Sequence, residues 1–238
     1  MAACASRVLL RTADYVVVDK PPDVRMDGVN HDVTMHTLAE AWLGAIPRFC
    51  HRLDYGTSGL LLGAFSKRAA AVAGAAFERK TARKEYVSVV RGVVEAEDFV
   101  VDAPLGPFGD GDFRVRVGGP KAKPATTRCR VLQRCAYLGQ PCTKVALTPL
   151  TGRRHQLRVH MRHVGHPLVG DATYDDSPTA AAPRMMLHAR SLVVPLGDAE
   201  RLVAETPDPF VVDDAGALRP RIGDLPLDPS RTRIVPIS

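Results

Sequence analysis

The chain has 238 residues, of which 45% are hydrophobic and 24% are charged, a balance typical of a globular protein with a sizeable core. This length suffices for one large core or for two lobes that share one. Lys and Arg number 32 against 26 Asp and Glu, which gives a net charge of +6. No stretch approaches the eighteen or so uninterrupted apolar residues that a membrane-spanning helix needs, so the sequence predicts no such helix.

The positive charge is unevenly distributed along the chain. Basic residues outnumber acidic ones by eight to three between His51 and Gly92, and by seven to one between Asp112 and Arg134. From Asp198 to the end, acidic residues outnumber basic ones by eight to five. A basic body suits a polyanionic partner such as RNA. A solvated basic surface without a partner is the alternative that charge alone leaves open.

The cysteines indicate a reducing compartment. They are odd in number and lack the spacing of a metal site: Cys4, Cys50, Cys129, Cys135 and Cys142. This pattern favours free thiols inside the cell over a disulfide framework. It does not choose between the cytoplasm, the nucleus and the mitochondrion.

The first part of the chain predicts a strand and then a helix. Residues 1–13 form a short N-terminal extension without acidic residues. The β-branched run from Tyr15 to Asp19 predicts a strand, which Pro21 and Pro22 end. Thr34 can cap a helix with Met35, Leu38, Ala39, Trp42 and Leu43 on one apolar face, and Gly44 ends that helix. Because Trp42 lies on that apolar face, we expect it in the core.

The next stretch, from Arg48 to Leu62, places a carboxylate in a turn. Asp54 follows Arg52 by two residues and precedes the turn formers Gly56, Ser58 and Gly59. Leu60 to Phe65 then reads as a buried strand. Such a turn can hold Asp54 at the edge of a sheet for catalysis. The spacing alone also allows an aspartate whose side chain caps its own backbone, and this is the commoner case.

An alanine-rich helix and a strand follow. Ser66 can cap a helix that runs to about Lys80, and the residues from Lys84 to Arg91 read as a strand that carries Tyr86. Arg79, Lys80 and Arg83 gather at the end of the helix, where its dipole favours cations. These basic side chains could also contact RNA.

Residues 98–125 are rich in Gly and Pro and predict a loop-rich excursion. Within it, apolar residues from Phe113 to Val117 alternate with Arg114 and Arg116, which predicts an exposed β-ribbon with one basic face. The ribbon could lie along an RNA backbone. It could also be an edge hairpin that charge protects from aggregation, which is the commoner arrangement.

The remainder predicts four strands, one helix and a tail. The strands are expected at Arg128–Gln133, Thr143–Thr148, Met186–Val194 and Arg201–Ala204. The helix is expected at Arg153–His163, with Leu157, Met161 and Val164 facing inward. Beyond Pro209 the chain is rich in Pro, Asp and Gly, so we expect a loosely held tail.

Several blocks, taken in order, resemble the RluA-type pseudouridine synthases. The central block is His51-Arg52-Leu53-Asp54 with Thr57-Ser58-Gly59-Leu60; Lys84-Glu85-Tyr86 resembles a second motif. Leu150 to His160, together with Gly165 to Asp171, resembles the third. Asp14 to Pro21 and Arg184 to Ala189 resemble the beginning and the end of the family's catalytic domain. The resemblance covers about residues 14–210, without the family's small N-terminal RNA-binding module.

The resemblance implies three catalytic residues. Asp54 matches the carboxylate that acts at the anomeric carbon when the bond from the sugar to uracil breaks. Arg158 matches the arginine that pairs with this carboxylate and keeps it ionised. Tyr86 matches the tyrosine that stacks on the target base and serves in proton transfer. Taken alone, Tyr86 would be an ordinary core aromatic on a strand. Isomerisation of uridine needs no metal or redox cofactor.

Other residues are expected to contact RNA. Arg52 matches the arginine that enters the RNA stack when the target uridine flips out. By motif or by charge, the predicted RNA-binding residues are His51, Arg52, Lys84, Arg114, Arg116, Arg153, Arg154 and His155. Arg154 precedes Arg158 by one helical turn and could also be a solvated surface residue. His160 is expected to pack or cap within its helix. The histidines lack Cys or acidic residues at ligand spacing, so no metal site is predicted.

The predicted fold is α+β, with a central, mostly antiparallel mixed sheet, flanking helices and an RNA-binding cleft. The expected domains are an N-terminal extension (1–13), a pseudouridine synthase catalytic domain (14–210) and a C-terminal tail (211–238). The predicted function is isomerisation of uridine in a structured rRNA or tRNA by a protein that is monomeric outside any large complex.

Two alternatives remain open. The first is a synthase-like RNA-binding factor that acts mainly in assembly, for example on a ribosomal precursor particle. The second is a base-releasing hydrolase, against which the lack of a second acid near Asp54 argues.

Overall fold

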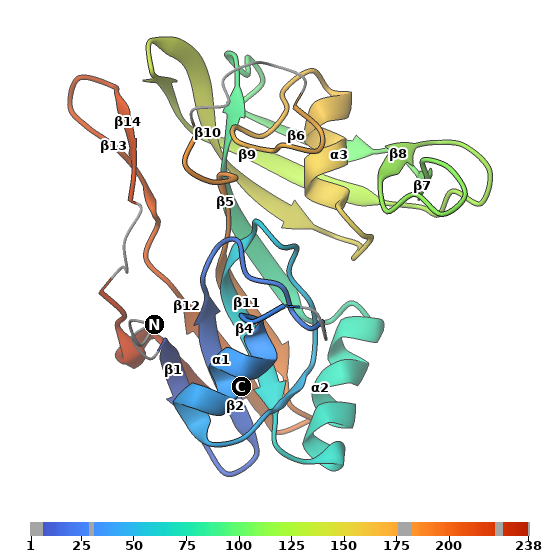
Figure 1. Cartoon of the computed structure of the whole chain (residues 1–238), viewed down its shortest axis with the longest axis vertical. Coiled ribbons are helices and arrows are strands. Elements are labelled where there is room, and N and C mark those ends of the chain that lie inside the picture. Colours follow the sequence, from blue (N-terminus) through green and yellow to red (C-terminus); the bar gives the residue numbers. More distant parts are fainter. Residues whose placement is uncertain (1–6, 29–30, 176–181, 222–225, 238) are drawn as a thin grey trace. The chain divides into compact units, whose positions relative to one another are not determined.

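The structure, a computed structural model, describes residues 7–28, 31–175, 182–221 and 226–237. The chain divides into two units, coloured by sequence in Figure 1. The first consists of Met1–Lys84, Ala189–Pro207 and Leu225–Ser238, and the second of Glu85–His188 and Asp208–Asp224. Each unit therefore combines segments that lie far apart in the sequence.

The first unit is a sheet with two helices. Strands β1, β2, β4 and β11 are neighbours in that order; β12 pairs with β11, β15 pairs with β12, and β3 pairs with β4. The elements are β1 (Val8–Arg11), β2 (Tyr15–Lys20), α1 (Met35–Leu43), β3 (Arg48–Phe49), β4 (Ser58–Ala64), α2 (Lys67–Glu78), β11 (Leu187–Pro195), β12 (Glu200–Glu205), a short 3-10 helix (Pro229–Arg231) and β15 (Arg233–Pro236). β11 begins at the end of the second unit, and most of its residues belong to the first.

Local sequence explains where the two helices of this unit begin and end. The Thr34 side chain accepts a hydrogen bond from the Thr37 backbone N–H, and the Thr37 side chain accepts one from the Thr34 N–H, which forms a capping box. Gly44 ends α1 in the left-handed conformation that glycine adopts most easily. Ser66 caps α2 by accepting a hydrogen bond from the Ala69 N–H.

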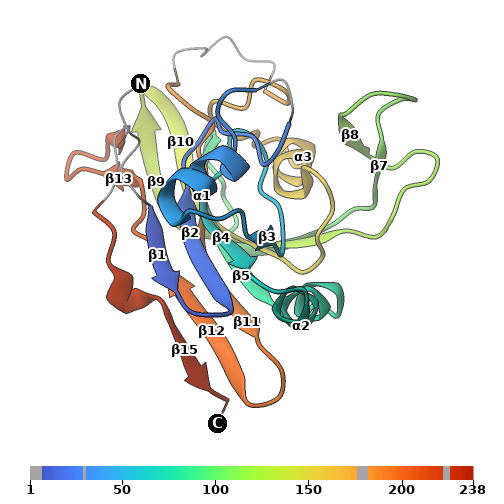
Figure 2. The same ribbon diagram turned by 60° about the horizontal axis from the view of Figure 1, so that its bottom comes forward.

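Small side chains let α2 pack closely on the sheet. Ala69, Ala73 and Ala76 are buried on α2, and they pack in one cluster with apolar residues of β2, β4, β11 and β12. All residues of β2 and β4 are buried, which requires cover on both faces of these strands. Helix α1 lies across β1 and β2 in both views (Figures 1 and 2).

In the second unit, strands β5, β10, β9 and β6 are neighbours in that order, and β7–β8 and β13–β14 form two separate two-stranded ribbons. Arg83 and Lys84, at the start of β5, belong to the first unit. Its elements are β5 (Arg83–Arg91), β6 (Asp98–Asp102), β7 (Leu105–Pro107), β8 (Val115–Val117), β9 (Thr126–Tyr137), β10 (Gln140–Pro149), α3 (Gln156–His163), β13 (Phe210–Val212) and β14 (Leu218–Pro220). In the antiparallel pair of β5 and β10, Tyr86 lies opposite Leu147.

The α+β prediction is confirmed. Within each unit, every strand pair with a defined register is antiparallel. The expected strands and the helices after Thr34 and Ser66 are present. Trp42 is only partly buried, so the expectation of a core tryptophan holds in part.

The RNA-binding cleft and the domain boundaries stay predictions. No helix in the described residues is long and apolar enough to cross a membrane.

Three expectations are wrong in part. The chain beyond Pro209 is not a loosely held tail where it is described, because β13 pairs with β14, β15 pairs with β12 and Phe210 is fully buried. The excursion after residue 98 begins with a regular strand, β6, which pairs with β9. Helix α3 begins at Gln156 rather than Arg153, and Val164 follows it and is exposed. The missed strands are short, and short strands leave little periodic signal in the sequence.

Candidate active site

Asp54 begins a tight turn that leads directly into β4. Its backbone carbonyl accepts a hydrogen bond from the Thr57 N–H at 3.1 Å, and β4 starts at Ser58. Leu53 before it is buried, whereas Asp54 itself is partly exposed. The turn thus presents the carboxylate at the end of a buried strand.

A buried lysine holds this turn. The Lys20 side chain is fully buried, and its Nζ donates to the carbonyl oxygens of Pro21 (2.9 Å), Tyr55 (3.0 Å) and Thr57 (2.8 Å). An ammonium group carries three protons and is costly to bury unless they are bonded. Two of these bonds end on the residues that follow Asp54, so Lys20 ties the turn to the end of β2.

Gly59 allows the strand after the turn to approach its neighbour closely. It has φ +108°, and a Cβ atom built there would lie 2.3 Å from the Ala189 carbonyl oxygen on β11. Any other residue would force the two strands apart. The glycine of the central motif is therefore a packing requirement of the strand that carries Asp54.

His51 faces inward, where it connects the turn segment to β4. Its Nε2 accepts a hydrogen bond from the Leu62 N–H at 3.1 Å, and its ring packs against Phe77 at 4.8 Å between centroids. Burial, reinforced by the charge of Lys84, lowers the pKa of His51 to about 3. The imidazole is therefore neutral and structural in this position. Its contact with RNA stays a prediction.

Arg52 lies on the surface with a carboxylate partner. Its Nη1 and Nη2 atoms donate to the two carboxylate oxygens of Asp27 at 2.8 and 3.3 Å, and the side chains are 68% and 50% exposed. The hydrogen bonds from Arg52 lower the pKa of Asp27. Asp27, which lies in the loop after β2, was assigned no role from the sequence.

In the second unit, Gln156 fixes the start of α3. Its Oε1 accepts hydrogen bonds from the Thr151 hydroxyl and the Arg153 N–H, and its Nε2 donates to the Thr126 carbonyl and the Thr127 hydroxyl. The residue before it, His155, has the left-handed φ of 53°. This network attaches α3 to the beginning of β9.

Arg158 is buried on α3 and held by Asp171. Its Nε and Nη2 donate to the two Asp171 oxygens, both at 2.7 Å. Its guanidinium also lies 4.9 Å from the ring centre of Tyr174. A guanidinium has five N–H donors, and Asp171 takes two of them. Its assigned partnership with Asp54 joins residues of different units and stays a prediction.

Tyr174 connects α3 to the β7–β8 ribbon. Its hydroxyl accepts a hydrogen bond from the Val115 N–H and bonds to Nδ1 of His155, both at 2.8 Å. His155 also meets Phe113 edge-on. The residues at the start of α3 thus support the ribbon through one buried tyrosine.

The ribbon itself is present and carries basic residues, as predicted. Arg114 pairs with Asp112 at 2.7 Å and lies 4.3 Å from the ring centre of Phe108, whereas Arg116 is exposed. Arg153 donates to the Pro124 carbonyl at 3.0 Å. The sequence predicted that Arg154 and Arg158 lie one turn apart on the same helix. Arg154 instead is exposed and precedes α3, so it does not share a helical face with the buried Arg158. RNA contacts by these residues stay predictions.

The remaining predicted residues lie on β5. Tyr86 is buried, and Lys84 is partly buried, with its pKa lowered by that burial.

Of the other histidines, His160 on α3 is fully buried, and its two ring nitrogens bond to the Thr127 hydroxyl (2.9 Å) and the Ala103 carbonyl (3.0 Å). His160 therefore packs in the core, as expected. The described residues contain no group of three potential metal ligands.

Three residues of evident structural importance to this site were given no role from the sequence: Lys20, Asp171 and Tyr174. Lys20 and Asp171 lie in segments that match the family motifs. Their sequence context alone does not show that they are buried. Charged residues are rarely buried without a partner, so a burial prediction would have singled them out. Tyr174 follows the last block and has no distinguishing pattern.

Comparison with known proteins decides the family. Residues 14–163 match the family described as RNA pseudouridylate synthase. The chain belongs to this family. A zebrafish (Danio rerio) protein, RNA pseudouridylate synthase domain-containing protein 1, is 39% identical over 220 residues, which cover 86% of this chain and 75% of that protein. The dual-specificity RNA pseudouridine synthase RluA of Pasteurella multocida is 36% identical over 183 residues, which cover 75% of this chain and 81% of that one.

Solved structures agree with this assignment. The structure of human RNA pseudouridylate synthase domain containing 1 superposes with a TM-score of 0.81 at 34% identity, covering 94% of this chain and 93% of that chain. Human RNA pseudouridylate synthase domain containing 4 superposes with a TM-score of 0.67 at 26% identity. The chain is thus a pseudouridine synthase, an isomerase that modifies RNA.

Proposed function

We propose that this pseudouridine synthase isomerises uridine in a structured rRNA or tRNA, and that Asp54 is the carboxylate that acts at the sugar. The observation that carries the proposal is the fixed turn at Asp54. The fully buried Lys20 donates hydrogen bonds to two backbone carbonyl oxygens of this turn. A carboxylate that acts on a glycosidic bond needs a fixed position relative to the anomeric carbon. The Lys20 clamp supplies that rigidity from within the same unit.

The reaction breaks the bond from the sugar to N1 of uracil and forms one to C5. Asp54 attacks the sugar or stabilises charge at its anomeric carbon while the base is detached and turns. The proton on C5 is lost after the new bond forms, and N1 gains one, so substrate and product are isomers. Tyr86 is proposed to stack on the base and assist this proton transfer, and Arg158 to keep the carboxylate ionised. These two roles rest on the family resemblance.

RNA binding is proposed to rely on basic residues of both units. In the first unit they are Arg52 and Lys84 together with His51, and in the second Arg114, Arg116, Arg153, Arg154 and His155. Phosphate contacts by such side chains position the RNA without reading its sequence. The exposed positions of Arg52, Arg116 and Arg154 support this part of the proposal.

We further propose that the protein acts as a monomer in a reducing compartment, on free RNA or on a ribosomal precursor particle. The four described cysteines are free, and Cys4 lies outside the described residues. Cys135 and Cys142 face each other across β9 and β10 with their sulfur atoms 3.2 Å apart. The odd number of cysteines and their lack of metal-ligand spacing support this part of the proposal.

Mapping pseudouridine across the transcriptome tests the proposed substrate. RNA from cells that contain the protein should carry pseudouridine at one or a few positions in rRNA or tRNA that lack it when the protein is removed. Re-expression of the protein should restore those positions. A set of lost positions confined to mRNA would refute the rRNA or tRNA assignment, and no lost position would refute the proposal for a cellular RNA substrate.

A further inference from the structure

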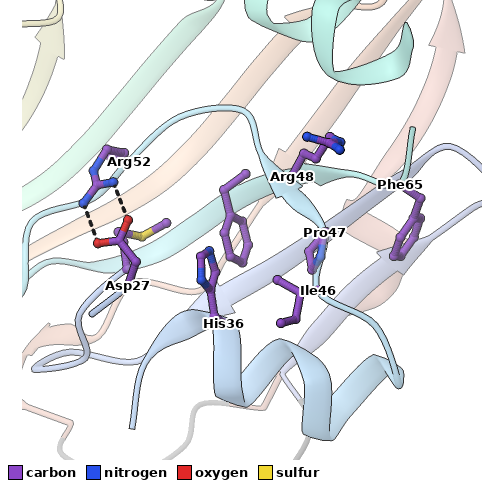
Figure 3. A pocket seen from close by; sticks show the side chains of 9 residues that line it. Asp27, His36, Ile46, Pro47, Arg48, Arg52 and Phe65 are labelled. Carbon is purple, nitrogen blue, oxygen red and sulfur yellow. Dashed lines mark hydrogen bonds and ion pairs between the residues drawn. The ribbon is translucent and has the colours of Figure 1, made fainter. Parts of the chain in front are cut away.

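A pocket of about 590 Å³ lies in the first unit beside Arg52. Its lining comes from the loop after β2, helix α1, the segment that contains β3, and the end of β4; the residues are Met26, Asp27, His36, Ile46, Pro47, Arg48, Phe49, Arg52 and Phe65. Asp54 is not among them. Figure 3 shows the Arg52–Asp27 ion pair at one end of the lining side chains and Phe65 at the other.

The lining combines aromatic and apolar side chains with charged ones. The rings of His36 and Phe49 are stacked nearly parallel, with 6° between their planes and 5.9 Å between their centroids. Ile46 beside them is 51% exposed, although it is a large apolar side chain. Aromatic faces at the surface of an RNA-modifying enzyme are suited to the π-face of a nucleobase.

The charges around the pocket are mostly positive. Arg48 and Arg52 line it, and the Arg11 guanidinium lies 5.5 Å from the ring centre of Phe65. Asp27 is the sole acidic residue among the lining side chains, and its carboxylate is bonded to Arg52. Arg48 is exposed and forms no ion pair with a residue that the structure describes. Arg48 is therefore the lining guanidinium most available to a phosphate.

We propose that this pocket binds one unpaired nucleotide of the substrate RNA that flanks the target uridine, with its base stacked on the His36–Phe49 pair and its phosphate on Arg48. The proposal rests on the proposed function, because Arg52 of the pocket lies two residues before Asp54. The combination of aromatic walls and an unpaired guanidinium matches a base joined to a phosphate. The volume exceeds that of one nucleotide base and leaves room for its ribose.

The two halves of the proposed site can be separated by ligand chemistry. The probes are a fluorescently labelled short oligoadenylate and an abasic ribose-phosphate oligomer of the same length, whose binding is measured by anisotropy at fixed salt. His36→Ala should weaken binding of the oligoadenylate roughly tenfold, as removal of one stacking contact does, and leave the abasic oligomer unaffected. Arg48→Ala should weaken binding of both probes, because both carry phosphates.

Two further variants serve as controls. Arg233→Ala removes the same charge from exposed β15, outside the pocket, and should change the affinity for either probe less than Arg48→Ala does. His36→Phe keeps an aromatic ring on α1 and should retain most of the oligoadenylate binding. If His36→Ala were merely misfolded, its melting temperature would fall and it would lose affinity for both probes.

The proposal is overturned if the wild-type protein binds the base-containing and abasic oligomers equally, or if His36→Ala binds the oligoadenylate as tightly as the wild type. It is also overturned if Arg48→Ala and Arg233→Ala have the same effect. These outcomes are separate from failure of the proposed function. If only the pocket proposal fails, the protein still forms pseudouridine and that activity still depends on Asp54. If only the proposed role of Asp54 fails, the oligomers still bind to the pocket as described.

Discussion

At the scale of single residues, the buried ammonium group of Lys20 connects β2 to the turn that carries Asp54. Three carbonyl acceptors surround it. Lys20→Met keeps the length of the side chain but leaves these acceptors without their donor. We expect it to lower the free energy of unfolding by about 3 kcal/mol or more, since each unsatisfied buried group costs roughly 1–3 kcal/mol. Urea denaturation measures this change.

The control for this variant is Lys67→Met, at the exposed start of α2. It makes the same chemical change without removing a buried hydrogen bond, so its effect should lie within about 0.5 kcal/mol. Equal stability of the Lys20→Met variant and the wild type would mean that water or a shifted backbone satisfies the carbonyl groups and that the clamp is dispensable.

His51 predicts a pH dependence of stability. Burial and the charge of Lys84 lower its folded-state pKa to about 3, whereas an unfolded histidine titrates near about 6.5. Between these values the unfolded chain binds a proton that the folded protein does not, so this residue makes stability fall as the pH drops from about 6.5 toward 3. Above about 6.5 the contribution is complete and constant.

Melting curves at a series of pH values test this origin. His51→Gln should reduce the loss of melting temperature between neutral and mildly acidic pH, even if the variant is less stable at pH 7. His163→Gln, which changes an exposed histidine of α3, should retain the wild-type dependence. An unchanged pH profile in the His51→Gln variant would show that other groups cause the acid sensitivity.

At the scale of elements, the contact between β4 and β11 depends on Gly59. A Cβ there would lie 2.3–2.8 Å from backbone atoms of Ala189, and φ is +108°. Gly59→Ala should therefore destabilise the protein by more than about 3 kcal/mol, the range of severe core changes. Gly74→Ala on α2 is the matched control: apart from its chain neighbours and the backbone of its own helix, no atom lies within 4 Å of the Cβ position, and we expect a gain of about 0.5–1 kcal/mol. A tolerated Gly59→Ala would contradict the proposed packing.

The β7–β8 ribbon carries a second prediction at this scale. Arg114 is neutralised by Asp112, whereas Arg116 forms no ion pair with a described residue. If the ribbon lies along RNA, Arg116→Ala should weaken binding and reduce the salt dependence of log K by about one unit of slope per lost phosphate contact. Arg114→Ala should have a smaller effect. Binding isotherms at several salt concentrations measure both, and unchanged slopes would mean that the charges only protect a sheet edge.

Local sequence predicted the elements whose signals are local. The caps at Thr34 and Ser66 and the ending at Gly44 depend on neighbouring residues, and all three were found where expected. Strands β13 and β15 were missed because each is only three or four residues long, and β15 also depends on β12, about thirty residues earlier in the chain.

The hydrogen bonds that hold the candidate catalytic residues could not be predicted from the sequence, and the catalytic roles themselves stay predictions. Family resemblance pointed to Asp54 and Arg158. The hydrogen bonds that hold them, donated by Lys20 to the turn and by Arg158 to Asp171, depend on burial that only the fold defines. Likewise, the Asp27–Arg52 pair joins residues 25 positions apart, and nothing in either local sequence indicates it.

At the scale of the whole molecule, each unit combines distant segments of the chain and each contains residues assigned to the reaction. Asp54 and Arg52 belong to the first unit, and Tyr86 and Arg158 to the second. The basic residues that we assign to RNA are likewise found in both units. The net charge of +6 favours association with RNA in general, so affinity alone does not identify the catalytic group.

The central claim is that Asp54 carries the chemistry. Asp54→Asn keeps the size of the side chain and removes its charge, so the variant should fold and bind RNA nearly as tightly as the wild type. A melting curve controls for lost stability. At the uridines mapped for the wild-type protein, the variant should form no pseudouridine, because a neutral amide cannot replace the carboxylate at the sugar. Pseudouridine at wild-type levels in cells that contain only the Asp54→Asn protein would contradict the account.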